Sequence, residues 1–347
     1  VQAAGRGAKP VCSSAGYCVG KLFQENKPNF SEEYHNTMAS PTNILIEASN
    51  GASDYGNKFG EPIVLGFTRS FREKVLEERR EWIKPIMFTS GYGLVRQAHL
   101  QKTSPQKEML LCKIGGPVYK IGLGGSTASS RASSDENSEL DFQAVQREDP
   151  QMEQKMNKVI QTCIEMGKNN PIESIHDQGA GGNGNVLKEL IDKHGATIDL
   201  TKLEYGEANL SIIETWLSEY QESNALLVQP DNIDILKSIC DREQVTLSIL
   251  GKITGDKNLI LKSHNYTAKL NYEKEYKELR RTYQMSSSYI PPMPVEDAYT
   301  NENTTQNETE NNKKTIKATE DTSTDTSDVF VKILSKLEVG SKRFLTN

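Results

Sequence analysis

The segment from Ile172 to Leu190 constrains the fold more than any other part of this chain. A short apolar run ends at Asp177, a glycine-rich loop follows, and apolar residues with helical spacing begin at Val186. This order predicts a buried strand, a loop and a helix, which is how α/β proteins present phosphate and metal ligands. Asp177, at the end of the predicted strand, is a candidate ligand for a divalent cation. A tight strand-to-helix turn with a capping acid is the alternative explanation.

The charge balance of the chain disfavours two classes of binding partner. The 347 residues include 41 Lys and Arg against 47 Asp and Glu, for a formal net charge of −6. A mildly acidic chain without a basic run argues against nucleic acid or an anionic membrane as the main partner. No apolar run of the sequence approaches the ~20 residues that span a membrane. Five scattered cysteines without a C-x-x-C pair predict a reducing, cytoplasmic location.

Helix and strand signals alternate along most of the chain. Ser40-Pro41 predicts the start of a helix and Gly51 its end, with a turn-rich loop at 54–62. Strands are predicted at 63–67 and 83–89, and the charged run 72–81 is expected to be a solvated excursion. A second unit is predicted from about residue 106. Its expected strands are 109–114, 172–177, 225–228, 247–253 and 258–261, and its expected helices are 149–167, one that starts at 186–190, 211–218 and 231–242. The alternation predicts a mixed α/β or α+β fold.

Three polar clusters beside apolar runs are candidates for a functional site. They are the segment 142–147 around Gln146, the loop after Asp177, and the run 216–222, which contains Glu219, Tyr220 and Gln221. Glu219 and Gln221 alternate in a predicted extended segment, so both are expected to face one cleft. A carboxylate beside an amide suits a polar, hydroxyl-bearing ligand. A helix cap for Gln146 and a surface charge for Glu219 are the alternatives, and His176 is expected to be a structural hydrogen-bonding residue.

Longer runs of the sequence resemble the large, single-chain phosphoribosylformylglycinamidine synthases of purine biosynthesis. The matching runs include GRGAKP at 5–10, EASNGASDYGNKFGEP at 47–62, KPIM at 84–87, GGPVY at 115–119, 140–150, 172–185, 219–222 and GSKRFLTN at 340–347. The likeness covers nearly all of the chain except the charged run 72–81 and a polar segment at 296–328. Matches of this length are far more specific than any short motif.

The resemblance implies the fold of the aminoimidazole ribonucleotide synthetase superfamily, in which two copies of an α/β unit each have an N-terminal and a C-terminal subdomain. Residues 1–105 then correspond to the second part of the first N-terminal subdomain, and residues 106–272 to the first C-terminal subdomain. Residues 273–328 are expected to be a linker with a low-complexity polar insertion. Residues 329–347 are expected to begin the second copy, which makes the chain an internal fragment.

The resemblance also implies an activity. The family converts formylglycinamide ribonucleotide, ATP and glutamine into formylglycinamidine ribonucleotide, ADP, phosphate and glutamate, and is therefore an ATP-dependent carbon–nitrogen ligase. It uses Mg²⁺, and ammonia from a glutaminase domain of the full-length chain displaces an activated formamide oxygen. The family's catalytic histidine and glycine-rich ATP motif are expected upstream of Val1. No catalytic residue is therefore assigned here, and this chain alone is expected to form no product.

Site residues carry over to matching positions of this sequence. Asp177 matches a magnesium ligand and Gln146 matches a residue that contacts the substrate. Glu219, Tyr220 and Gln221 match a Glu-Ser-Gln substrate motif. Tyr220 replaces the usual serine of that motif, so a backbone contact is what carries over at this position.

Two further residues lie in a strongly matching run. Asn57 and Gly60 are expected to line the cleft on the strength of that run. The alternative function is a non-catalytic nucleotide-binding module of the same superfamily. A sister enzyme such as a ribonucleotide cyclo-ligase is a third hypothesis, which the runs at 5–10 and 54–62 disfavour.

Overall fold

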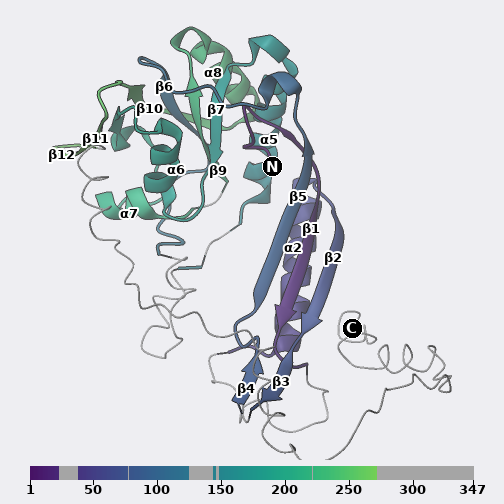
Figure 1. Cartoon of the computed structure of the whole chain (residues 1–347). Helices are drawn as coiled ribbons and strands as arrows, with labels where there is room; N and C mark the ends of the chain where they lie inside the picture. Colours follow the sequence, from purple (N-terminus) through teal and green to yellow (C-terminus); the bar gives the residue numbers. More distant parts are fainter. Residues whose placement is uncertain (23–37, 77, 125–143, 146–147, 221, 272–347) are drawn as a thin grey trace, which may run out of the picture. The chain divides into compact units, whose positions relative to one another are not determined.

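The computed structural model describes residues 1–22, 38–76, 78–124, 144–145, 148–220 and 222–271 (Figure 1). Gln146, Gln221, the predicted linker and the predicted second copy lie outside these residues. The described part contains a three-stranded sheet, a seven-stranded sheet and a two-stranded hairpin, together with helices. This combination of helices and sheets confirms the predicted fold class.

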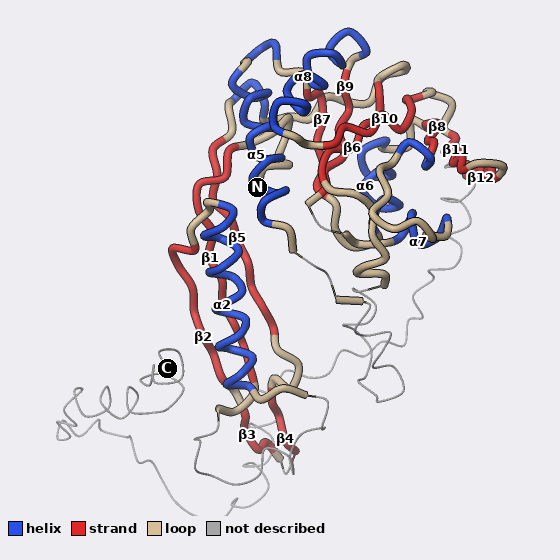
Figure 2. The backbone as a smooth tube through the Cα atoms, turned by 180° about the vertical axis from the view of Figure 1, so that it is seen from behind, coloured by secondary structure: helices blue, strands red, loops and turns tan. Residues whose placement is uncertain are grey.

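The three-stranded sheet is built around one β-α-β unit. Its strands are β1 (Lys9–Val19), β2 (Ile63–Ser70) and β5 (Ile86–Leu94), in the order β2-β1-β5. Helix α2 (Pro41–Phe59) connects β1 to the parallel β2 and runs along the sheet in Figure 2, whereas β5 pairs antiparallel with β1. Tyr17 and Val19 of β1 pack against Leu45 of α2 in a small apolar core.

Helix α2 begins as predicted but continues past its predicted end. The Ser40 side chain accepts a hydrogen bond from the Asn43 N–H at 3.1 Å and caps the helix. The helix then runs through Gly51 to Phe59 and ends at Gly60, whose φ is +89°. The predicted end at Gly51 and the predicted loop at 54–62 are therefore wrong. A glycine costs a helix only about 1 kcal/mol, and packing of the buried face as far as Phe59 outweighs that cost.

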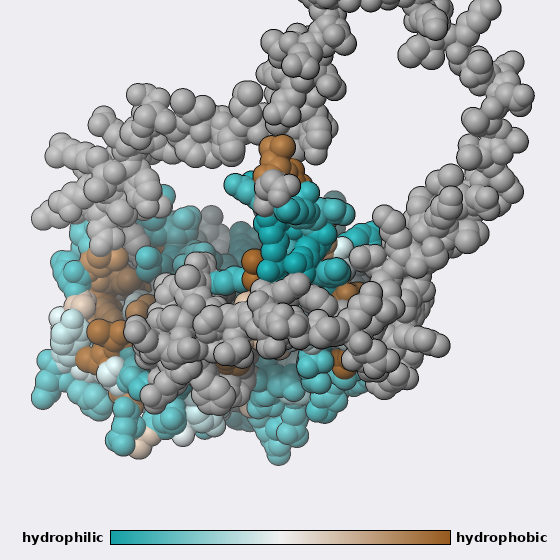
Figure 3. Space-filling model, turned by 90° about the horizontal axis from the view of Figure 1, so that it is seen from below, coloured by the Kyte–Doolittle hydropathy of each residue, from teal (hydrophilic) through white to brown (hydrophobic). Residues whose placement is uncertain are grey.

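The charged run forms a hairpin at one end of this sheet. Strands β3 (Arg72–Val75) and β4 (Glu78–Glu81) pair with each other in antiparallel fashion and are largely exposed. Figure 3 shows the described surface from one side, mostly hydrophilic, with apolar residues in separate patches. None of the described helices is long and apolar enough to cross a membrane.

The seven-stranded sheet has the order β12-β11-β8-β10-β6-β9-β7. All neighbouring strands are antiparallel except β8 and β11. Five of the strands lie where the sequence predicts them, and β8 and β12 are additional. The bounds are β6 (Leu110–Gly115), β7 (Ile172–Asp177), β8 (Ala196–Asp199), β9 (Ser223–Val228), β10 (Thr246–Ile253), β11 (Asn258–Ser263) and β12 (Tyr266–Asn271).

Helices cover both faces of this sheet because its strands alternate apolar side chains between two cores. One core contains Cys112 of β6 with residues of α5 (Pro150–Glu165) and α8 (Ile233–Glu243). The other contains Leu111 of β6 with residues of α6 (Gly182–Ile191), and α7 (Ile212–Leu217) packs against it. Short 3₁₀ turns occur at Gln97–His99, Gly167–Asn169, Leu200–Lys202 and Pro230–Asn232.

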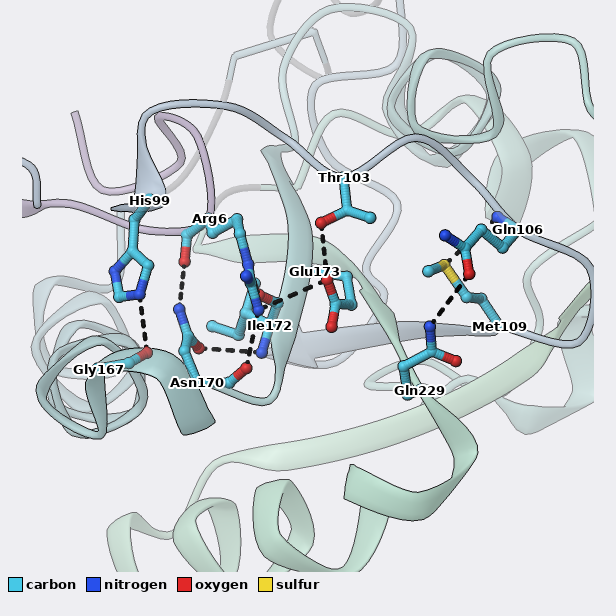
Figure 4. Close-up of polar contacts among 10 residues, drawn as sticks. All are labelled: Arg6, His99, Thr103, Gln106, Met109, Gly167, Asn170, Ile172, Glu173 and Gln229. Carbon is cyan, nitrogen blue, oxygen red and sulfur yellow. Dashed lines mark hydrogen bonds and ion pairs between the residues drawn. The ribbon is translucent and has the colours of Figure 1, made fainter. Parts of the chain in front are cut away.

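Arg6 ties the N-terminal segment to strand β7 (Figure 4). Its guanidinium donates to the carbonyl oxygens of Ile172 at 2.7 Å and Asn170 at 3.0 Å, and it pairs with Glu173 at 3.5 Å. Asn170 Nδ2 donates back to the Arg6 carbonyl at 2.9 Å. Thr103 Oγ1 donates to the Glu173 carboxylate at 2.7 Å. These bonds fix two separate N-terminal segments to the strand that ends at Asp177.

Candidate functional site

The strand, loop and helix predicted for 172–190 are all present. β7 ends at Asp177, and α6 begins at Gly182 after a left-handed N-cap at Gly181, with φ +80°. Gly182 also has a positive φ, +57°, and a Cβ on it would lie 2.3 Å from the Ser218 carbonyl oxygen. The glycines therefore allow the loop to fold tightly against the segment that leads to Glu219.

A carboxylate already lies at the amino end of α6. The Gly181 N–H donates to Glu219 Oε1 at 3.0 Å, and Glu219 is buried. The amino end of a helix favours a negative charge because its N–H groups lack helical partners. Within the described residues, that charge comes from this chain's own Glu219. The third polar cluster of the sequence is thus in direct contact with the second.

Tyr220 points into the core rather than into a cleft. Its hydroxyl donates to Asn183 Oδ1 at 3.1 Å, and Asn183 Nδ2 donates to the Thr215 carbonyl at 2.9 Å. Burial raises the pKa of Tyr220 to about 12, so the hydroxyl remains a neutral donor. The Tyr220 carbonyl accepts a 2.8 Å hydrogen bond from Gln178 Nε2. The side chain at this position is therefore structural.

A cavity of about 520 Å³ adjoins the end of β7. Helix α2 supplies Tyr55, Gly56 and Phe59 to its wall, and the ends of β7 and β9 supply polar groups. The polar lining consists of Gln2, Ser13, Ser14, Tyr55, Glu61, Thr89, Ser90, Glu153, Asp177, Gln178, Glu222, Ser223 and Asn224. Asp177 thus lies beside a cavity large enough for a small-molecule ligand.

Asn57 and Gly60 are exposed and are not among the residues that line this cavity. The helical repeat explains the difference, because Ala52, Tyr55 and Phe59 share one face of α2 and Asn57 faces away from it. Gly60 follows the last helical residue as the C-cap. Other residues of the matching run 47–62, such as Tyr55 and Phe59, line the cavity instead.

The cavity wall contains one buried carboxyl group, Glu222, and two that are half-buried, Glu61 and Glu153. Tyr55 Oη donates to Glu222 Oε1 at 3.0 Å, and Gln2 Nε2 donates to Glu153 Oε1. Burial, assisted by the charge of Glu222, raises the pKa of Glu153 to about 7. Burial also raises the pKa values of Glu61 and Glu222. Burial therefore stabilises the neutral forms of Glu61, Glu153 and Glu222 relative to the same carboxyl groups in water.

Two buried polar atoms at the cavity lack partners among the described residues. They are Gln2 Oε1 and Asn224 Nδ2, and both side chains are more than nine-tenths buried. An acceptor and a donor left unpaired in a cavity wall are available to a polar ligand. Sequence reasoning assigned no site role to either residue, nor to Tyr55, Glu153 or Glu222, because no local pattern shows which polar side chains folding brings together.

Asp177 and His176 occupy different roles. The Asp177 side chain is 71% exposed at the cavity. His176 Nε2 pairs with Glu189 Oε2 at 2.5 Å, and its Nδ1 lies 2.9 Å from the Asp177 carbonyl oxygen, in keeping with the structural role expected for it. No group of three or more His, Cys, Asp or Glu side chains in the described part of the chain is arranged to hold a metal ion. One exposed carboxylate nevertheless suits Mg²⁺, which commonly combines one or two carboxylates with water and substrate phosphates.

Comparison with known proteins identifies the class of this fold. The model of the AIR synthase related protein, C-terminal domain, matches residues 107–264. Two solved structures of T. maritima PurL share the fold over 77% of this chain. The complex with FGAR has a TM-score of 0.59 at 19% identity, over 39% of its own chain. The complex with ATP has a TM-score of 0.54 at 16% identity, over 37% of its own chain.

Sequence comparison finds relatives that share one name. Phosphoribosylformylglycinamidine synthase of Homo sapiens is 51% identical over 269 residues, which are 75% of this chain and 20% of that protein. The Dictyostelium discoideum protein of the same name is 42% identical over 355 residues, covering 99% of this chain and 25% of its own length. The chain is similar to part of these phosphoribosylformylglycinamidine synthases, and it spans about a fifth to a quarter of their length.

Proposed function

We propose that this chain forms the part of a phosphoribosylformylglycinamidine synthase that binds formylglycinamide ribonucleotide and Mg-ATP. The proposed reaction is ATP-dependent amidine formation, with ammonia supplied by a glutaminase domain of the full-length protein. The observation that carries the proposal is the polar cavity beside Asp177, in a chain 40–51% identical to relatives of that name. The PurL complexes with FGAR and ATP support this choice of ligands through the shared fold.

The residues of the cavity have distinct proposed roles. Asp177 would hold Mg²⁺, which when bound offsets the negative charge of ATP phosphates. Asn224 Nδ2 and Gln2 Oε1 would bind hydroxyl or amide groups of a ligand, because both are buried and unpaired among the described residues. Gln146 and Gln221 remain proposed substrate contacts. The Tyr220 carbonyl is proposed to contribute indirectly, by accepting the hydrogen bond from Gln178, which lines the cavity. Glu219 would act by holding the loop that carries Asp177.

Two features of the chain bear on its cellular location and on the activity expected of this polypeptide alone. All five cysteines are free thiols, which supports the proposed cytoplasmic location. The proposed catalytic histidine and ATP-binding glycine motif belong to other parts of the longer relatives, by the resemblance described above. We therefore expect this polypeptide by itself to form no formylglycinamidine ribonucleotide from ATP, ammonia and formylglycinamide ribonucleotide. Detection of product from the purified chain would contradict that expectation.

Replacing Asp177 by Asn in the full-length enzyme tests the proposed function. The amide keeps the size of the side chain but removes its charge, so we expect the Mg²⁺ concentration for half-maximal rate to rise by ~10-fold or more. The measurement is the initial rate of ADP and product formation as Mg²⁺ is varied. Asp234→Asn is the matched control, since it is the same substitution at an exposed position of α8 that does not line the cavity.

The same experiment separates the proposal from a non-catalytic nucleotide-binding module. A module that only stores nucleotide would leave kcat, KM and the Mg²⁺ dependence of the Asp177→Asn enzyme unchanged. Unchanged kinetics with normal folding would therefore reject the role of Asp177 in catalysis.

A further inference from the structure

Lys113 is a buried lysine at a position where the sheet otherwise places apolar residues. Leu111 and Lys113 share one face of β6, and Leu111 belongs to the core beneath α6. Lys113 itself is only 3% exposed. Burial lowers its pKa well below the ordinary range for lysine. Burying an amine beside an apolar core costs free energy unless the amine is hydrogen-bonded. The hydrogen-bond partners of Lys113 therefore indicate its role.

The partners of Lys113 both belong to the candidate site. Its Nζ donates to Gln178 Oε1 and lies 5.4 Å from the centre of the Tyr220 ring. Among the described residues Lys113 makes no ion pair, although Glu204 lines the same small cavity. Gln178 directly follows the proposed magnesium ligand, and Tyr220 directly follows Glu219. Lys113 therefore contacts both segments whose association forms the site.

Lys113 determines how Gln178 is oriented. With Oε1 accepting from the lysine, Gln178 Nε2 is directed at the backbone and donates to the Tyr220 carbonyl at 2.8 Å. The Gln178 N–H donates to the Ser223 carbonyl at 2.9 Å, and this bond between backbone groups fixes the start of the loop independently of side-chain rotamers. Without the lysine, the buried amide oxygen would lose its partner, and only the hydrogen bonds of Nε2 would still orient the amide.

We propose that Lys113 is a positioning residue for this site. Through Gln178 it holds the end of β7 and the segment carrying Glu219 and Tyr220 in one arrangement at the cavity. Lys113 does not touch a ligand in this role, because it lies behind Gln178, which itself lines the cavity. The inference rests on the proposed function, since it assumes that Asp177 acts at this cavity.

The test uses the full-length enzyme with Lys113→Met. Methionine keeps most of the unbranched stem and removes the buried amine. We expect kcat/KM for formylglycinamide ribonucleotide to fall by ~10- to 100-fold, because small displacements of site residues have effects of this size. The thermal unfolding midpoint is expected to stay within a few degrees of the parent. Lys237→Met is the matched control, since this lysine is exposed on α8, and we expect it to change neither quantity.

A double-mutant cycle with Gln178→Met shows whether Lys113 acts through Gln178. We expect Gln178→Met to have the same kinetic defect and the double variant to lose no more than the larger single loss. Independent, additive losses would overturn the proposal. If Lys113→Met fails to fold, Gln178→Met decides the question alone, and parental kinetics in that variant would overturn it.

The Asp177→Asn enzyme distinguishes failure of this inference from failure of the proposed function. Impaired Asp177→Asn with parental kinetics in Lys113→Met and Gln178→Met would reject only the positioning role. Parental kinetics in Asp177→Asn would reject the function on which that role rests.

Discussion

Replacing Gly182 by Ala is expected to destabilise the chain by about 2–5 kcal/mol, from backbone strain and steric overlap together. The residue has a φ of +57°, which an L side chain rarely adopts. Its new Cβ would lie 2.3 Å from the Ser218 carbonyl oxygen and 2.8 Å from the Leu217 carbonyl carbon. Both are backbone atoms, so relief requires the loop and the segment before Glu219 to move apart.

Gly179→Ala is the matched control within the same loop. Gly179 does not have a positive φ, and an added Cβ there would meet nothing within 4 Å. We expect the free energy of unfolding of this variant to lie within about 1 kcal/mol of the parent's. Chemical unfolding of both variants gives the comparison. Equal stability of the two would show that close contact between the loop and residues 217–218 does not stabilise the fold.

Replacing Glu153 by Gln is expected to stabilise the chain at pH 8 and to have little effect near pH 4. The folded-state pKa of about 7 exceeds the ordinary value of 4.5, so between these values the folded state binds more protons than the unfolded state. Stability therefore falls as pH rises from about 4.5 to about 7, and the loss is complete above that range. The difference, 7 − 4.5, corresponds to at most about 3 kcal/mol.

The measurement is the free energy of unfolding at several pH values between 4 and 8. The amide introduced by Glu153→Gln would still accept the hydrogen bond from Gln2 Nε2, while the titrating charge would be gone. Glu165→Gln, at the exposed end of the same helix, is the control and should leave the pH dependence unchanged. A Glu153→Gln chain less stable than the parent at pH 8 would show that the charged form of Glu153 stabilises the fold.

Elements with strong local signals were predictable from sequence. Ser40 and Asp149 each precede a proline and cap the helices expected there. The apolar run ending at Asp177 is a strand, and Val186 is the first of the large apolar side chains that the following helix buries. These features depend on a few neighbouring residues, so they are legible in the sequence itself.

Elements that depend on distant partners were not predictable. Residues 9–19 contain a proline, two serines and a glycine, which gives no clear strand signal. They nevertheless form β1, because β2 and β5 supply hydrogen-bond partners on both sides. Gly51 looks like the end of a helix locally, but burial of Phe59 further along keeps α2 helical.

Some features of the candidate site could likewise be predicted from the sequence, and others could not. The sequence by itself determined the loop after Asp177, its glycines, and the family resemblance of the runs around it. Only the tertiary structure decided that Glu219 binds the N–H of Gly181 and that Tyr55 and Glu222 meet at the cavity. It also placed Lys113 behind Gln178. Glycine conformation and capping are local properties of the chain, whereas burial, pairing and pKa depend on residues that only folding brings together.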